Sequence, residues 1–446
     1  MKKTIAMLLA LVMVFALCAC GGSSAPAAAE APAAEAPAAE APAEAPAAEG
    51  SVYWLNFKPE SDQALQELAA MYTEETGVPV KVVTAASGTY NETLTAEMDK
   101  SNPPTLFVVG NQAAVDTWGD YCLDLTGAPV TDELNTNEYM LYDADGKLCS
   151  IGYCYECYGI IVNKALLAEA GHDISEITNF DSLKAVVEDI TARKDELGFS
   201  AFTSAGMDGS SSWRFTGHVA NLEYYYESVD NPDAWKSCPA ELTGAYMQNY
   251  RNLLDLMFEN STVDRSALAA GGFDANAEFA NGEAAFYVNG SWAWNDLQAS
   301  MKAEDLAMIP YYCGVEGEEK AALNCGTENY WAVNCEADEA DIQATLDFLY
   351  WLVTSETGTT TLADTMGFDI PFKAAKESTN YFKKVAAESV ASGKTPVTWN
   401  FTTMPSETWK NGVGAALTDY AQGTGDWDAV VTAFVDNWAT EYAAAN

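Results

Sequence analysis

The fold is decided where the folded part of the chain begins, by the stretch Ser51-Val-Tyr-Trp-Leu-Asn-Phe57, an apolar run typical of a buried strand. A helix that ends at Gly77 is expected next, because apolar residues recur at helical spacing between Leu65 and Tyr72. The same alternation continues with an expected strand over 78–84, a helix over 90–98 and a strand over 105–109. Strands that alternate with helices predict βαβ units, a parallel sheet and an α/β fold.

Polar side chains follow two of these expected strands. Lys58 and Glu60 come directly after the first strand, and Asn111 and Gln112 follow the strand that ends at Val109. In open parallel sheets, ligands bind beyond the C-terminal ends of the strands. These four side chains are therefore candidate solute contacts.

Further along, the sequence predicts a strand over Tyr158–Val162, a helix that ends at Gly171, and a helix that Asn179 caps and that continues through Ile190. The C-terminal part is predicted to be mainly helical, over 340–354, 377–392, 409–421 and 429–442. The 396 residues from position 51 to the end exceed what one core usually supports, so two lobes are expected.

The first 20 residues are predicted to be a signal peptide. A positive head, Lys2 and Lys3, precedes the apolar run Ile5–Leu17, which is too short to span a bilayer comfortably. The following residues, Leu17-Cys18-Ala19-Cys20, resemble the bacterial lipobox, which implies that Cys20 carries lipid and becomes the new N-terminus. An ordinary signal peptide cut elsewhere is the alternative. Lipid on Cys20 would anchor the protein to the cell membrane, facing outward, without spanning it.

Residues 21–50 are predicted to be a tether. They repeat Ala-Pro-Ala-Ala-Glu and contain no aromatic residue, so they have little with which to build a core. Proline favours extended backbone and the spaced glutamates repel one another. We expect a semi-rigid segment that holds the folded part away from the membrane.

The formal net charge of the chain is −43. Such a charge argues against nucleic acid as a partner and against adhesion to anionic lipid by charge alone. It also argues mildly against an anionic solute.

Eight cysteines remain after Cys18 and Cys20 are set aside. An even number in an exported protein permits disulfides, whose pairing the sequence leaves open. Cys154 and Cys157 have the spacing of a redox motif, but they lie in a strand-like run without a thioredoxin-type βαβ context. Buried free thiols are the favoured interpretation.

Four segments, in order along the chain, resemble the extracellular solute-binding proteins of carbohydrate ABC importers (maltose-binding-protein-like, family 1 lipoproteins). The opening Tyr53-Trp-Leu-Asn56 resembles the first strand of that family. The run Gly159-Ile-Ile-Val-Asn163-Lys164 resembles its hinge-crossing strand and the helix that follows. The stretch Gly282-Glu-Ala-Ala-Phe-Tyr-Val-Asn-Gly290-Ser-Trp292-Ala-Trp294-Asn matches its Gly-Glu-x-Ala…Asn-Gly-x-Trp-Ala-Trp signature, and Met366-Gly-Phe-Asp-Ile-Pro371 resembles a later Gly-x-x-Pro segment.

The resemblance implies a two-lobed periplasmic-binding-protein fold (type II), with discontinuous lobes joined by a hinge and the ligand in the interlobe cleft. It implies an N-lobe built from residues 51–155 and 328–375, and a C-lobe built from 156–327 and 376–446. Solute would shift such a protein toward closure, because both lobes contact the solute only when closed. The implied function is to capture a sugar, an oligosaccharide by preference, and to deliver it to the permease subunits of an ABC transporter. A monomer is expected.

The resemblance also assigns aromatic contacts. Sugars present apolar ring faces on which aromatic rings stack, and hydroxyl edges that polar groups bind. Trp292 corresponds to a stacking tryptophan of the family, and Trp409 lies near the place of another. Trp213 lies where the family has a further aromatic contact, next to Arg214, which has a planar group able to bind hydroxyls. Trp294 is expected to pack beneath the site.

Three further contacts are expected from the same resemblance. Glu156 matches a carboxylate on the hinge side that accepts hydrogen bonds from sugar hydroxyls. Asn329 and Tyr330 lie where the chain should cross back between the lobes. Lys58 and Gln112 stand where maltose-binding relatives have acidic groups nearby, which argues against maltose itself.

Rival functions come from other classes. An enzyme is disfavoured, because the sequence has only two histidines and lacks a nucleophile elbow, a phosphate loop and a His-Glu-x-x-His motif, although paired carboxylates would suit a surface glycoside hydrolase. The same fold binding ferric iron is a second alternative, since Tyr224-Tyr225-Tyr226 loosely resembles iron-binding tyrosines. A polyamine is a third. No cofactor and no metal ligand set is predicted.

Overall fold

The computed structural model describes residues 50–445, apart from the side chains of Lys236, Phe401 and Thr402. The predicted signal peptide, the predicted lipidation site Cys20 and the predicted tether up to residue 49 lie outside the described residues. Within residues 50–445, no helix has both the length and the apolar character that crossing a bilayer requires.

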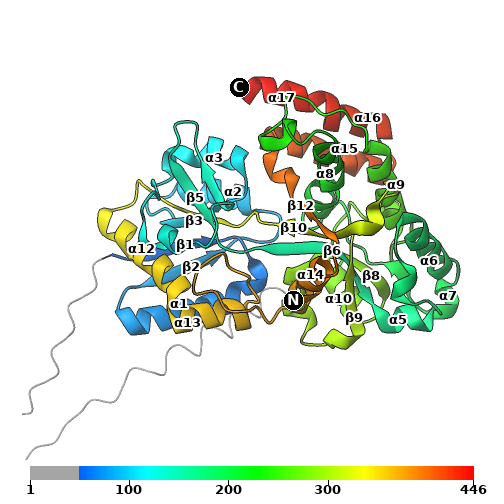
Figure 1. Cartoon of the computed structure of the whole chain (residues 1–446), viewed down its shortest axis with the longest axis horizontal. Coiled ribbons are helices and arrows are strands. Elements are labelled where there is room, and N and C mark those ends of the chain that lie inside the picture. Colours follow the sequence, from blue (N-terminus) through cyan, green and yellow to red (C-terminus); the bar gives the residue numbers. More distant parts are fainter. Residues whose placement is uncertain (1–49, 446) are drawn as a thin grey trace, which may run out of the picture. The chain divides into compact units, whose positions relative to one another are not determined.

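The described chain forms two separate sheets, and each is covered by helices (Figure 1). We call each sheet with its covering helices a lobe. The first sheet has six strands in the order β2 (Val80–Thr84), β1 (Val52–Asn56), β3 (Leu106–Val109), β11 (Tyr330–Val333), β5 (Leu148–Gly152) and β4 (Met140–Tyr142). The second has the order β12 (Thr395–Thr398), β10 (Ala321–Gly326), β6 (Glu156–Asn163), β8 (Ala284–Gly290) and β7 (Ser200–Phe202), and β9 (Leu306–Ile309) also pairs with β6.

The prediction of a parallel sheet is right for β1, β2 and β3 and wrong for the strands beside them. β1 pairs in parallel with β2 and with β3, whereas β11 is antiparallel to both β3 and β5. In the second sheet β6 is antiparallel to β8, β9 and β10. A parallel pair needs a crossover connection within its own sheet. The chain enters β11 directly from β10, which belongs to the second sheet. β11 is therefore not joined to its neighbours in the first sheet by a crossover, and it can run antiparallel to them.

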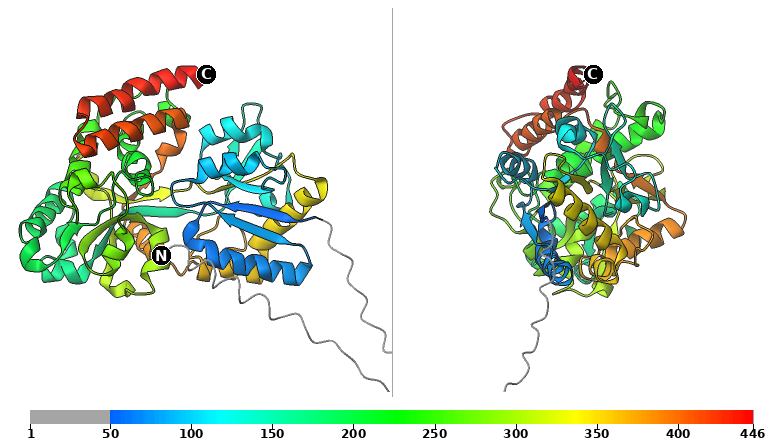
Figure 2. Two further views of the ribbon diagram at one scale, coloured as in Figure 1. Left: turned by 180° about the vertical axis from the view of Figure 1, so that it is seen from behind. Right: turned by 90° about the vertical axis from the view of Figure 1, so that its left-hand side faces the viewer.

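The helices of the first lobe lie on both faces of its sheet, with α2 and α3 on one side and α1, α12 and α13 on the other (Figures 1 and 2). These helices are α1 (Asp62–Thr76), α2 (Tyr90–Met98), α3 (Gln112–Trp118), α4 (Pro129–Asp132), α12 (Glu339–Thr354) and α13 (Glu356–Thr360). The second lobe has α5 (Lys164–Glu169), α6 (Phe180–Ala192), α7 (Lys194–Leu197), α8 (Asn221–Asp230), α9 (Met247–Glu259), α10 (Ala275–Ala280), α11 (Trp294–Leu297), α14 (Tyr381–Ala391), α15 (Glu407–Gln422), α16 (Trp427–Val431) and α17 (Asn437–Ala445).

Each lobe has its own apolar core. In the first, Trp54 of β1 packs edge-on against Trp331 of β11 and Phe348 of α12. In the second, a helical group around Trp409 and Trp438 joins the large cluster on its sheet. Separate cores let each lobe keep its structure while the two lobes move relative to each other.

The chain passes between the sheets three times. The first two passages are short: Tyr153–Tyr155 links β5 to β6, and Thr327–Asn329 links β10 to β11. The third is the segment 366–380, which runs from the first lobe to α14. The expected lobe limits at 155/156, 327/328 and 375/376 fall within or directly beside these passages, and the lobe ranges themselves stay a prediction.

All eight described cysteines are free thiols, and six of them are buried. The structure agrees with the favoured interpretation of the sequence. Cys154 and Cys157 form no disulfide with each other.

Candidate functional site

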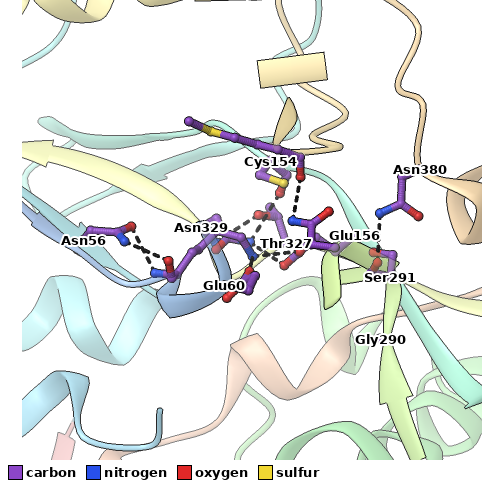
Figure 3. Close-up of polar contacts among 12 residues, drawn as sticks. Asn56, Glu60, Cys154, Glu156, Gly290, Ser291, Thr327, Asn329 and Asn380 are labelled. Carbon is purple, nitrogen blue, oxygen red and sulfur yellow. Dashed lines mark hydrogen bonds and ion pairs between the residues drawn. The ribbon is translucent and has the colours of Figure 1, made fainter. Parts of the chain in front are cut away.

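A buried ion-pair group lies where the passages meet. The ammonium nitrogen of Lys58 lies 2.8 Å from Oε1 of Glu156 and 2.9 Å from Oε1 of Glu60. Asn56, at the end of β1, shapes this loop, because its side-chain oxygen accepts from the Lys58 N–H and its amide donates to the Lys58 carbonyl. Figure 3 shows Asn56, Glu60, Glu156 and Asn329 gathered at this point, with dashed lines for their polar contacts. The first lobe thus places its lysine against the first residue of β6.

The second oxygen of Glu156 accepts a hydrogen bond of 2.8 Å from the side-chain amide of Asn329, which is fully buried. Asn329 belongs to the passage between β10 and β11, and its own N–H donates to the Thr327 hydroxyl. Burial by itself lowers the pKa of Lys58, but the carboxylates of Glu156 and Glu60 raise it, so the pKa lies well above its usual value. Lys58 is therefore a fixed positive charge.

Two tryptophans lie next to this group. The rings of Trp213 and Trp292 have centroids 5.6 Å apart with planes tilted by 54°, and the Lys58 ammonium lies 5.8 Å from the Trp292 ring. Both rings are only partly buried. Gly290, at the end of β8, is required here, because a Cβ on it would lie 2.2 Å from the Trp292 ring. We call Lys58, Glu60, Glu156, Asn329, Trp213 and Trp292 the junction cluster.

Arg214 supports Trp213. Its guanidinium lies 4.2 Å from the Trp213 ring centroid and donates hydrogen bonds to the Val288 carbonyl and the Tyr287 hydroxyl. The side chain is 8% exposed. Arg214 thus packs against the Trp213 ring, and two of its five N–H donors bond to β8.

The two lobes also contact each other directly. The carboxylate of Glu407, at the start of α15, accepts hydrogen bonds from Asn91 at 3.4 Å and from Asn111 at 3.2 Å. Nearby, Gly88 of the first lobe packs so closely on Gly209 of the second that a Cβ on Gly88 would lie 2.2 Å from the Gly209 carbonyl oxygen. These contacts hold the facing loops of the lobes together.

The structure brings together most, but not all, of the residues expected from the sequence. Asn111 caps α3 through its oxygen while its amide contacts Glu407. Gln112 lies outside the cluster, since its amide donates to the Tyr142 carbonyl of β4. Tyr330 is 7% exposed and belongs to the core of the first lobe.

Trp409 does not face the junction cluster. It is 2% exposed, its indole N–H donates to the Phe434 carbonyl, and its ring packs edge-on against Trp438. A ring buried on both sides has no face to offer a sugar, so the expectation of a stacking role is not met by this geometry. The cause lies in the helical spacing of α15, where the buried positions Trp409, Val413 and Leu417 follow one stripe. Trp294 packs against Tyr381 and Phe382, and its expected place beneath the site stays a prediction.

Sequence reasoning missed Glu328, Glu407 and Lys410. Glu407 and Lys410 lie in the first turn of α15, and neither belongs to the row of buried residues along that helix. Their place on the helix is the one feature of the sequence that points to them. Glu328 is adjacent to the predicted Asn329, but nothing in the sequence distinguishes the two.

The iron alternative depends on three consecutive tyrosines, 224 to 226. Tyr224 is fully buried and stacks on Phe434 in the core of the second lobe. Among residues 50–445, no group of three or more His, Cys, Asp or Glu side chains is placed to hold a metal ion.

Two lobes linked by three passages, with an ion-pair group and two tryptophans at their junction, define the class of two-lobed solute-binding proteins. Residues 67–389 match the family of bacterial extracellular solute-binding proteins, and the chain belongs to this family.

Individual relatives are distant. A multiple sugar-binding protein of Streptococcus mutans serotype c is 23% identical over 257 residues, which are 54% of this chain and 57% of that protein. The chain therefore matches only a little over half the length of this curated relative.

Solved structures share the fold. RafE in complex with raffinose has a TM-score of 0.67 and 17% identity, and the match covers 88% of this chain and 99% of that one. The GacH receptor of Streptomyces glaucescens, solved unliganded and with acarbose, has a TM-score of 0.65 and 17% identity, with 89% and 99% covered. At these identities the similarity shows the two-lobed fold alone.

Proposed function

We propose that this protein captures a sugar, an oligosaccharide by preference, between its two lobes and delivers it to the permease of an ABC transporter. The observation that carries the proposal is the pair of partly exposed tryptophans, Trp213 and Trp292, beside the fixed charges of Lys58 and Glu156. Aromatic faces and ordered polar groups are what a sugar ring needs on its faces and edges. Sugars in the names of the relatives, raffinose and acarbose among them, support the same class of solute.

The lobe organisation belongs to this proposal. We take residues 51–155 and 328–375 as the N-lobe, and 156–327 and 376–446 as the C-lobe, with the solute in the cleft between them. Contacts such as Glu407 with Asn111 are those of lobes brought together. A solute that contacts both lobes shifts the equilibrium toward this arrangement, which the permease then recognises.

The proposal places the protein outside the cell, anchored to the membrane by lipid on Cys20 and acting as a monomer. It assigns no catalysis. Glu60 and Glu156, the two carboxylates of the junction cluster, both form ion pairs with Lys58. Burial lowers the pKa of His218 to about 3, so that histidine is neutral at physiological pH.

A thermal-shift screen of residues 51–446 tests the function. The panel contains raffinose, acarbose and chitin oligosaccharides, together with spermidine and ferric citrate. A solute that binds only the folded state stabilises it by about 2.7 kcal/mol at a hundredfold excess over its Kd.

A rise in melting temperature with a sugar supports the proposal if the Trp292→Ala variant no longer shows it. The control variant Trp351→Ala, on the distant helix α12, should still show the rise. A rise in melting temperature with spermidine or ferric citrate alone would contradict the proposal that the solute is a sugar. Only the solute-binding fold would then still stand. Release of smaller sugars during incubation would contradict the non-catalytic role.

A further inference from the structure

The charged side chains around the junction cluster differ in whether the protein supplies their partners. Lys58 is paired with Glu60 and Glu156, and Glu407 receives two amide donors. Glu328 and Lys410 are different. Within the described residues, neither side chain makes a hydrogen bond or an ion pair, although both are partly buried.

Both side chains lie near the junction cluster. Glu328 lies in the passage from β10 to β11, next to Asn329, and a Cβ on Gly110 at the end of β3 would lie 3.8 Å from the Glu328 Cβ. Lys410 lies in the first turn of α15, three residues after Glu407. The charge of Lys410 acts on both Glu328 and His218, and His218 packs against Trp292. The two groups thus come from different segments, Glu328 next to Asn329 and Lys410 near the histidine that packs against Trp292.

We propose that Glu328 and Lys410 are two further solute contacts of the site, with the protonated Glu328 carboxyl group donating a hydrogen bond to a sugar oxygen and the Lys410 ammonium group donating a second one. This inference rests on the proposed sugar-binding function and adds two residues to it. Partly buried polar and charged groups without hydrogen-bond partners are costly, and a polyhydroxylated solute supplies the missing hydrogen bonds.

Burial, followed by the surrounding charges, sets the pKa of the Glu328 carboxyl group, which carries a proton in part of the molecules near neutral pH. Burial raises its pKa, Lys410 and Lys58 lower it, and Glu156 and Glu407 raise it, with a net pKa of about 7. A sugar that excludes water from the carboxyl group raises this pKa further, because it removes hydration that favours the charged form. Binding then takes up a proton, and affinity falls as the pH rises.

Titration calorimetry of the full chain in detergent tests this, with raffinose, acarbose and chitin oligosaccharides as the probes, between about pH 6 and about pH 8. We expect affinity to fall by about threefold to tenfold over this range, with proton uptake seen as a dependence of the heat on buffer ionisation. Glu328→Gln keeps a donor and cannot ionise, so it should bind within about threefold of the wild type near pH 6 and lose the pH dependence and the proton uptake.

Lys410→Met should weaken binding about tenfold at both pH values, because a charged donor is lost. The exposed Glu169→Gln and Lys384→Met serve as controls and should match the wild type. A sugar that binds with no pH dependence, or a dependence that persists in Glu328→Gln, overturns the inference and leaves the proposed function standing. Failure of every sugar at both pH values sinks the proposed function, and the inference with it.

Discussion

Lys58 of the first lobe and Glu156 of the second form a buried ion pair 2.8 Å long, with side chains only 4% and 5% exposed. One residue follows β1 and the other begins β6, so the pair joins the two sheets at the point where the chain passes between them. Several consequences of this junction are open to measurement.

Glu156→Gln should lower the free energy of unfolding by about 3 kcal/mol, because it leaves Lys58 buried with Glu60 as its one remaining ionic partner. Urea denaturation checks this. The double variant Lys58→Met/Glu156→Gln removes the stranded charge and should recover part of the loss. Equal stability of Glu156→Gln and the wild type would show that the pair is not desolvated.

Gly88→Ala should weaken solute binding, because the new methyl group would lie 2.2 Å from the Gly209 carbonyl oxygen and keep the facing loops apart. We expect a loss of about tenfold or more in affinity, measured by calorimetry. Gly146→Ala is the matched control, since Gly146 also has a positive φ but has open space around it. An equal effect of both substitutions would attribute the loss to backbone strain rather than to contact between the lobes.

Asn111→Asp should also weaken binding, by about 1–2 kcal/mol, because it places a carboxylate against Glu407 while it keeps the oxygen that caps α3. Glu407→Gln in the same chain supplies a donor opposite the new carboxylate and should restore most of the affinity. Calorimetry on the two variants and their combination measures the coupling. Additive losses would indicate that the two residues do not meet in the bound state.

Glu223→Gln should stabilise the protein at neutral pH. Glu223 is fully buried on α8, and burial together with the nearby Glu227 raises its pKa well above the usual value. The folded state therefore keeps a proton that the unfolded chain releases above about pH 4.3, so stability falls as the pH rises past that point. We expect the variant to gain about 1–2 kcal/mol near pH 7 and nothing near pH 4. Urea denaturation at both pH values checks this, with Glu169→Gln as the control, and identical profiles would contradict it.

Local signals predicted several elements of both lobes well. The helix expected over 90–98 is α2, the helix expected to end at Gly77 ends there, and the cap expected at Asn179 is present with its capping box. Each of these depends on neighbours within a few residues, such as a left-handed glycine or a side chain that binds the first turn.

Two other predictions failed, the first because a local capping signal was missed and the second because burial by either sheet looks alike in the sequence. The helix expected from 377 begins at Tyr381, because the Asn380 side chain caps it there. The strand-like run 150–162 is two strands in different sheets, separated at Tyr153–Tyr155. Continuous apolarity does not distinguish one buried strand from two, since burial by either sheet produces the same pattern.

The candidate site divides in the same way. Trp292 and Glu156 were found through motifs that lie within one segment, and the structure places both in the junction cluster. Partners such as Glu407 with Asn111 are 296 positions apart, and no local pattern relates them. The site residues themselves stay predictions until a solute is bound.

The three passages between the sheets have a mechanical consequence. A single passage would let the two lobes rotate freely about it. Three neighbouring passages permit bending but resist twisting, so the lobes can open in essentially one direction. They also provide redundancy. A protease that cuts one link leaves two intact, so a nicked molecule should migrate as one particle in a native gel and separate into fragments only after denaturation.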